Sequence, residues 1–132
     1  MNSFERRFTA AAADIDELGH VNNAVWVRWV QDVAVAHWEA AARAEHRAAF
    51  FWVVVRHEID YLRALREGGE VTARTWVGEG PRGARFDRLV EFSGADGAVH
   101  VRARTTWAII DRASGRATRV PKEVAATFAA DG

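Results

Sequence analysis

The spacing of hydrophobic and polar residues predicts one long helix near the start of the chain. The helix is expected from Ala24 to about Arg43, or roughly five turns. The residues that recur on its buried side are Trp26, Val30, Val33, His37 and Ala41. Asn22 or Asn23 is a natural N-cap for it. Further apolar residues widen the stripe, so the helix is predicted to be buried over much of its circumference.

The other apolar positions mostly alternate with polar ones, as in half-buried β-strands. One strand is expected before the helix, at residues 4–9. Further strands are expected at residues 51–63, 70–78, 85–92, 99–110 and 116–120, separated by turn residues such as Gly, Pro, Asp and Ser. In the strand at 99–110, apolar side chains share one face, and Arg102 and Arg104 share the other. Pro121 then opens a short C-terminal helix.

This order of elements indicates an α+β fold in which an antiparallel sheet, joined by hairpins, covers a long helix. The chain has 132 residues and no linker or repeat, so a single domain over residues 1–132 is expected. The sheet face that carries Arg102 and Arg104 is expected to meet either solvent or another subunit.

Composition and charge exclude several classes of function. Lys plus Arg and Asp plus Glu both number 18, so the net charge does not indicate a nucleic-acid partner. The absence of cysteine excludes disulfides, thiolate metal sites and a cysteine nucleophile. The first nine residues lack the apolar segment of a signal peptide, and no run approaches the roughly 18 apolar residues of a membrane span. A soluble cytoplasmic protein without a membrane partner is expected.

A polar segment, Asp14 to Asn23, lies immediately before the predicted helix. A helix start exposes unpaired backbone N–H groups and carries a partial positive charge. A carboxylate beside it is therefore placed for acyl transfer, because the N–H groups stabilise developing negative charge. The alternative for Asp14 and Asp16 is capping of the loop backbone. The spacing of the two acids resembles a calcium loop, but Leu18 and Val25 stand where oxygen ligands are needed, so no metal is expected.

The run Asp16-x-x-Gly19-His20-Val21-Asn22-Asn23 and the order of elements resemble the hotdog-fold thioesterases. The nearest subgroup is the 4-hydroxybenzoyl-CoA thioesterase-like one, with acyl carrier protein thioesterases as relatives. Weaker similarities occur at Ile59-Asp60-Tyr61, Gly68-Gly69-Glu70-Val71 and Val120-Pro121. The resemblance covers nearly the whole chain. It implies a hotdog fold, in which one antiparallel sheet of five or six strands wraps around a long central helix.

The resemblance implies hydrolysis of an acyl-CoA or acyl carrier protein thioester, with neither cofactor nor metal. Asp16 matches the catalytic carboxylate, which acts as nucleophile or general base. Asn23 matches the residue whose backbone N–H, at the helix start, binds the thioester oxygen. His20 and Asn22 match pocket positions, and His20 either takes part in the chemistry or holds the loop. The family also implies a homodimer or a dimer of dimers, with paired sheets and active sites at the subunit interface.

Several residues are expected to contact the substrate. Val21, Asn22 and Trp26 are expected at the acyl end, although core packing also explains an apolar side chain there. The phosphates of CoA need cations and bidentate donors, for which Arg82, Arg85 and Arg119 are the candidates, with ordinary solvation as the alternative.

Two other functions remain as alternatives. A hotdog hydratase or dehydratase has Asp and His five positions apart with an Asn-Pro between them, whereas Asp16 and His20 are four apart with no proline. A non-catalytic acyl-CoA binding module stays open. The carrier-protein branch also has an asparagine where Leu18 stands and a glutamate near Ala64, which favours a scheme with one carboxylate.

Overall fold

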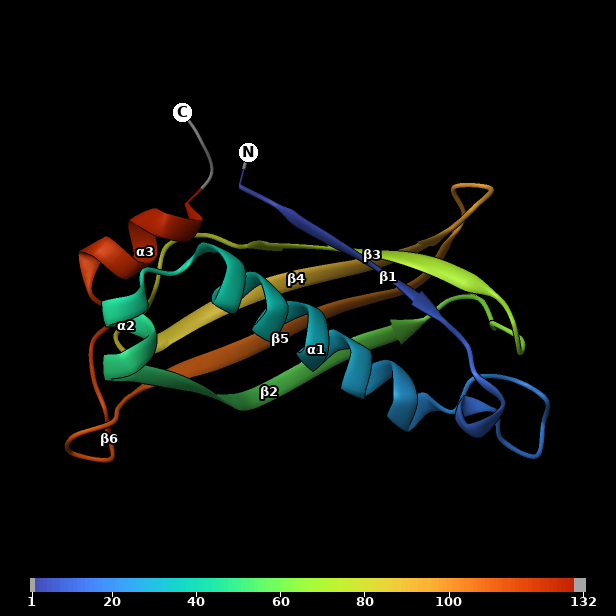
Figure 1. Ribbon diagram of the computed structural model, residues 1–132, viewed down its shortest axis with the longest axis horizontal. Helices are drawn as coiled ribbons and strands as arrows, with labels where there is room; N and C mark the ends of the chain where they lie inside the picture. The colour runs from blue at the N-terminus through green and yellow to red at the C-terminus, as the bar shows by residue number, and fades with distance from the viewer. Residues whose placement is uncertain (1, 130–132) are drawn as a thin grey trace.

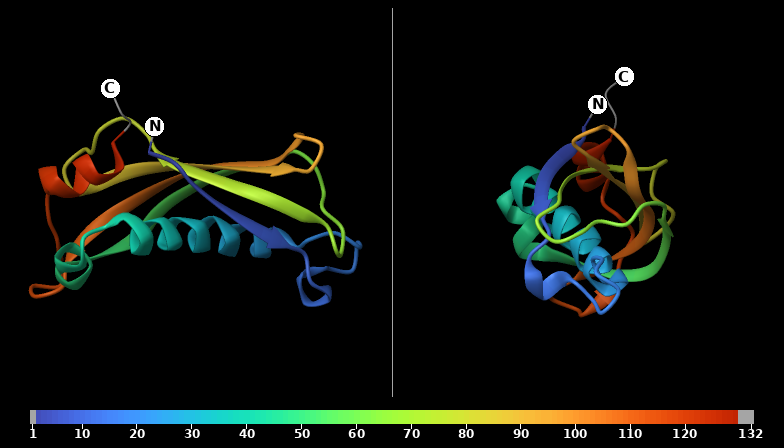
Figure 2. Two further views of the ribbon diagram at one scale, coloured as in Figure 1. Left: turned by 45° about the horizontal axis from the view of Figure 1, so that its top comes forward. Right: turned by 90° about the vertical axis from the view of Figure 1, so that its right-hand side faces the viewer.

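A curled antiparallel sheet wraps around one long helix in the computed structural model, which describes residues 2–129 (Figures 1 and 2). The strands are β1 (Phe4–Thr9), β2 (Phe50–Tyr61), β3 (Glu70–Val77), β4 (Arg85–Gly94), β5 (Val99–Asp111) and β6 (Arg116–Ala117). The helices are α1 (Asn23–Ala41), α2 (Ala44–Ala49) and α3 (Lys122–Phe128), with a 3₁₀ turn at Ala12–Asp14. The strand order is β1-β3-β4-β5-β2, and β6 pairs with β5. This is the hotdog fold that the sequence predicted.

Helix α1 lies along the concave face of the sheet and forms one side of the core (Figure 2). Its side chains Val30 and Val33 are completely buried. They pack with inward-facing strand residues such as Phe92 of β4 and Val101 of β5. Burial of this apolar stripe stabilises α1 more than helix propensity does, since five of its first eight residues are Val or Trp.

The alternation predicted for the strand at 99–110 is confirmed. In the antiparallel pair β4–β5, Phe86 lies opposite Trp107 and Arg88 lies opposite Thr105. All four of these side chains are buried on the helix side of the sheet. Arg102 and Arg104 of β5 are exposed on the other side, which is polar.

The structure differs most from the predicted boundaries at the end of the long helix and at the last strand. The predicted helix to about Arg43 ends at Ala41, because Ala42 and Arg43 take extended backbone angles, and a separate helix α2 follows. The strand predicted at 116–120 contains only Arg116 and Ala117. None of the helices formed by residues 2–129 combines the length and the apolar character that crossing a membrane requires.

The start of α1 is held by a side-chain cap. The Oδ1 atom of Asn22 accepts a hydrogen bond from the N–H of Ala24 at 2.8 Å. Substitution Asn22→Ala is therefore expected to lower the free energy of unfolding by about 1 kcal/mol, as measured by urea denaturation. Asn23→Ala is the matched control and is expected to leave stability unchanged or slightly higher. Equal losses in both variants would show that the cap contributes nothing.

The strand β2 forms one edge of the sheet and pairs only with β5 among the described strands. Its pairing is interrupted by a register shift between Val54 and Arg56. The side chains of Val53 and Val55 are 39% and 44% exposed there. Among the described residues, this twelve-residue edge leaves backbone hydrogen-bonding groups unpaired and apolar area exposed.

Candidate active site at the start of the long helix

The polar segment before α1 folds as a tight hairpin. Ile15 and Val21 form an antiparallel bridge, and the N–H of Asp16 donates to the carbonyl of His20 at 2.9 Å. The N–H of Gly19 donates back to the carbonyl of Asp16 at 3.0 Å. Gly19 has a φ of +82°, which glycine adopts without strain. The hairpin thus holds Asp16 against the strand segment that leads into the helix.

Asp16 has a carboxylate oxygen that is not engaged by the fold. Its Oδ1 atom accepts the N–H of Leu18 at 2.9 Å, while Oδ2 has no hydrogen bond to any of residues 2–129. Asp14 is different, because its two oxygens accept the N–H of Ala11 and the guanidinium of Arg28. The half-buried Asp16 is therefore the acid with an oxygen available for chemistry, and Asp14 holds the loop.

The helix start supplies an available donor close to this acid. The side chain and carbonyl of Asn22 accept the N–H groups of Ala24 and Val25. The N–H of Asn23, the first helical residue, donates to no acceptor within residues 2–129. The hydroxyl of Tyr61, at the end of β2, lies 3.5 Å from the carbonyl oxygen of Asn23. One backbone donor at the positive end of α1 is thus left for a ligand.

The other predicted residues of this segment divide into two groups. His20 is half-buried, and its ring has no hydrogen bond within the described chain. Val21 and Trp26 are buried in the core behind the hairpin. The indole of Trp26 packs edge-on against Trp29 and Phe92. The structure therefore brings together Asp16, His20, Asn22 and Asn23, with Val21 and Trp26 as their apolar support.

The three predicted phosphate-binding arginines lie at the opposite end of the protomer. Arg82 and Arg85 flank the turn before β4, and the N–H of Val120, next to Arg119, donates to the carbonyl of Gly83 at 2.9 Å. This is the end where α2, α3 and β6 gather, whereas the hairpin before α1 lies at the other end (Figure 1). Within one protomer these arginines do not reach Asp16.

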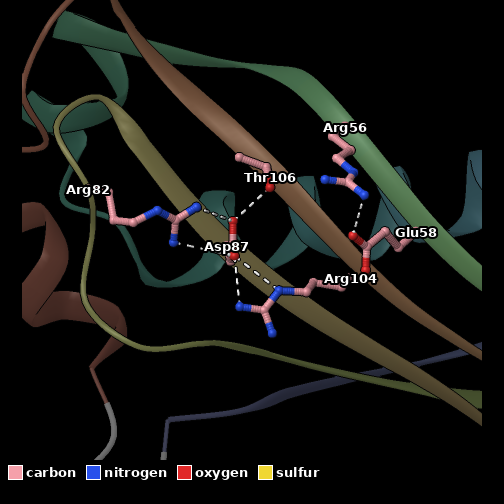
Figure 3. A network of polar contacts seen from close by, with 6 residues as sticks. All are labelled: Arg56, Glu58, Arg82, Asp87, Arg104 and Thr106. Atoms are coloured by element: carbon pink, nitrogen blue, oxygen red, sulfur yellow. Dashed lines mark hydrogen bonds and ion pairs between the residues drawn. The ribbon is translucent and has the colours of Figure 1, made fainter.

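Arg82 is also engaged in an ion pair on the polar face of the sheet (Figure 3). The buried carboxylate of Asp87 accepts hydrogen bonds from Thr106 at 2.7 Å, Arg104 at 2.8 Å and Arg82 at 3.3 Å. Burial by itself raises the pKa of the Asp87 carboxyl, but these hydrogen bonds outweigh it and bring the pKa below its ordinary value. Asp87 therefore stays ionised, and Arg82 would have to share its charge with a phosphate.

A cavity of about 460 Å³ opens at this same end, between the second half of α1 and the sheet. One of its lining residues is Arg88, which sequence analysis did not single out. The period-two pattern of β4 contained the signal, since Arg88 stands between Phe86 and Val90 on the buried face. Residues 2–129 contain no group of three or more His, Asp or Glu side chains arranged to hold a metal ion.

Comparison with known proteins agrees with this architecture. The structure resembles 1,4-dihydroxy-2-naphthoyl-CoA thioesterase Slr0204 from Synechocystis, with 16% identity over 96% of this chain and 95% of that one, at a TM-score of 0.80. It also resembles SAV2348 from Staphylococcus aureus, solved in complex with CoA, with 16% identity over 95% and 80% of the chains and a TM-score of 0.82. The DHNA-CoA thioesterase from S. aureus shares 15% identity over 91% and 82%, with a TM-score of 0.78.

A search of curated protein sequences finds no match. The sequence pattern of the thioesterase-like superfamily, however, matches residues 11–128, which include the hairpin, all of α1 and all of α3. The chain therefore belongs to the thioesterase-like superfamily and is a hotdog-fold protein of the thioester hydrolase class.

Proposed function

We propose that the protein hydrolyses acyl-CoA thioesters, with Asp16 as nucleophile or general base and the N–H of Asn23 as oxyanion donor. The observation that carries this proposal is that one hairpin presents both a free carboxylate oxygen and a free helix-start N–H. Both groups are accessible to a ligand, because Asp16 is only partly buried and Asn23 is exposed. His20, on the same hairpin, is proposed to line the reaction site.

Both forms of the chemistry use these two groups. In the nucleophilic form, Asp16 attacks the thioester carbon, the CoA thiolate leaves, and water then hydrolyses the acyl-aspartyl anhydride. In the general-base form, Asp16 takes a proton from water as the water oxygen attacks the same carbon, and the C–S bond of the resulting tetrahedral intermediate then breaks to release the CoA thiolate. In both forms the carbonyl oxygen becomes negative, and the N–H of Asn23 and the α1 dipole stabilise it.

CoA as the carrier is supported by the relatives named above, one of which was solved with CoA bound. A panel of acyl-CoA esters tests it directly, with release of the CoA thiol followed by a chromogenic disulfide reagent. We expect turnover of at least one ester in the panel. If the esters bind but are not hydrolysed, the protein is instead a non-catalytic acyl-CoA binding module.

We further propose that the active form is a homodimer joined through β2. Strand β2 runs from the cavity end of the protomer, at Phe50, to the Asp16 end, where Tyr61 contacts Asn23. Antiparallel pairing of two β2 strands would place the Asp16 end of one protomer beside the cavity end of its partner. Arg82, Arg85 and Arg119 would then be supplied to Asp16 by the second chain, which accounts for their distance from it within one chain.

Substitution Val55→Asp is expected to convert the dimer to a monomer at micromolar concentration and to lower kcat/KM at least about 10-fold. The physical reason is that two aspartates would approach each other across the twofold interface, desolvated and of like charge. Sedimentation velocity measures the first effect and thiol release the second. Ala117→Asp, on the exposed strand β6, is the matched control and should remain a dimer. A wild-type protein that sediments as a monomer would contradict the proposed dimer.

A further inference from the structure

Aromatic side chains make up most of the apolar lining of the cavity of about 460 Å³. They come from α1, β2, β4, β5 and α3, and they are Trp38, Phe51, Trp52, Phe86, Trp107 and Phe128. Such a volume and lining suit a small apolar ligand, and the ring faces favour a flat one. The cavity residues of α1, from Ala34 onward, lie about 20 Å along the helix from Asn23. The cavity is therefore a separate place from the Asp16 hairpin of the same protomer.

Arg88 brings a positive charge into this aromatic layer. Its side chain is only 8% exposed and extends from the helix-facing side of β4. Its Nη1 atom lies 2.8 Å from Nδ1 of His37 and 3.2 Å from Oγ1 of Thr75, and the guanidinium carbon lies 5.4 Å from the ring centroid of Phe128. No carboxylate within residues 2–129 forms an ion pair with Arg88. Its neighbour Asp87 also lines the cavity, but the carboxylate of Asp87 is bound by Arg82, Arg104 and Thr106 (Figure 3).

The neighbours of Arg88 do not neutralise it. Burial lowers the pKa of Arg88 to about 10, so the guanidinium stays protonated at neutral pH. Burial and the charge of Arg88 lower the pKa of His37 to about 4, so that ring is neutral and accepts the hydrogen bond from Arg88 on Nδ1. A buried cation without a carboxylate is unusual, because no attraction to an opposite charge offsets the free-energy cost of desolvating it. The carboxylate of a ligand would offset the desolvation cost of the Arg88 guanidinium.

We propose that this cavity binds a flat, apolar molecule that carries a carboxylate, with Arg88 as the cation that pairs with the carboxylate. The aromatic side chains hold the body of the ligand. The other charged lining residues are two exposed arginines, Arg47 and Arg112, one exposed acid, Glu39, and Asp87, which is paired with Arg82 and Arg104. Positive charge is therefore in excess, and Arg112 covers the ring of Phe51 at 5.1 Å. This charge attracts an anionic ligand toward the cavity.

Such a carboxylate has two sources. It belongs either to a free aromatic acid, or to a second carboxyl group on the acyl chain of a thioester held at the partner's hairpin. The second source rests on the proposed function and dimer, because only a second protomer brings a thioester at Asp16 near the cavity. The recognition chemistry at Arg88 is the same for both.

Isothermal titration calorimetry with a matched pair of probes tests the proposal on the intact protein. Biphenyl-4-carboxylate and its uncharged carboxamide have nearly the same size and shape and differ in charge. We expect the wild-type protein to bind the carboxylate at least about 10-fold more tightly, as a desolvated charge pair implies. Equal affinities, or no binding of the carboxylate, would overturn the proposal.

Three substitutions at two arginines test which charge is responsible for the preference. Arg88→Gln is expected to remove the preference for the carboxylate, whereas Arg104→Gln, on the polar face of the same sheet, is expected to retain it. Arg88→Lys keeps the charge and should retain part of the preference. A preference that survives Arg88→Gln would overturn the assignment. Should Arg88→Gln fail to fold, as judged by circular dichroism, the affinities of the wild-type protein for the carboxylate and the carboxamide still test the proposal.

Inhibition kinetics distinguish the two sources. Competitive inhibition of thioester hydrolysis by biphenyl-4-carboxylate supports the acyl-group source, and binding without competition supports a free acid. The titration is repeated with the Asp16→Asn protein, which should bind the probe as tightly as wild type. Binding at the cavity is thus measured independently of catalysis. A protein without the proposed thioesterase activity can still bind the probe, so the two failures are distinguishable.

Discussion

Replacing Asp16 by asparagine is expected to lower kcat for acyl-CoA hydrolysis at least about 100-fold while the protein stays folded. The amide oxygen of asparagine can still accept the N–H of Leu18, which Oδ1 of Asp16 now accepts at 2.9 Å, so the hairpin keeps its geometry. The substitution removes only the negative charge, which both the nucleophilic and the general-base schemes need. Thiol release at saturating substrate measures kcat, and thermal denaturation followed by circular dichroism checks the fold.

Glu17→Gln provides the control for this experiment. Glu17 is the next residue, is exposed, and has no side-chain hydrogen bond or ion pair within residues 2–129. Its loss removes the same charge from the same hairpin, so turnover should stay within about 2-fold of wild type, as for an ordinary surface charge. If a folded Asp16→Asn protein hydrolyses acyl-CoA at nearly the wild-type rate, Asp16 is not the catalytic acid.

Much of the fold could be predicted because its elements are long and strongly patterned. The stripe around Val30 and Val33 identified α1, and the alternation through Val101, Ala103 and Thr105 identified β5 together with its buried face. The break after α1 could not be predicted, since Ala42 and Arg43 are good helix formers with no glycine or proline nearby. The chain turns there because α2 must pack beside the start of β2, which is a tertiary constraint.

The candidate site could be predicted only as far as it is local in sequence. Asp16, His20, Asn22 and Asn23 lie within eight residues, and one hairpin assembles them. The cavity could not be predicted, because Arg88 meets a histidine that lies 51 residues away in the sequence. The distance between the predicted arginines and Asp16 likewise depends on the whole sheet. Periodicity shows which face of a strand or helix a residue occupies. It does not show which residues that are distant in sequence lie at the same end of the protomer.

Replacing Asn23 by proline is expected to lower kcat by about 10²- to 10³-fold, as the loss of an oxyanion donor does in other acyl-transfer enzymes. Asn23 is the first residue of α1, where proline is well tolerated because the N–H it lacks has no helical partner. The preceding residue, Asn22, has φ −62° and ψ 141°, which are the angles that a following proline requires. The substitution therefore removes one hydrogen-bond donor from the site and leaves the helix intact.

Asn23→Ala separates the backbone donor from the side chain, since alanine keeps the N–H and removes the amide group. If the N–H binds the oxyanion, the alanine variant retains most of the wild-type kcat, and only the proline variant loses it. Equal losses in both variants would assign the effect to the side chain, and full activity in the proline variant would exclude this N–H as the oxyanion donor. Because the donor acts on the transition state, the loss should appear in kcat and in kcat/KM, with KM nearly unchanged.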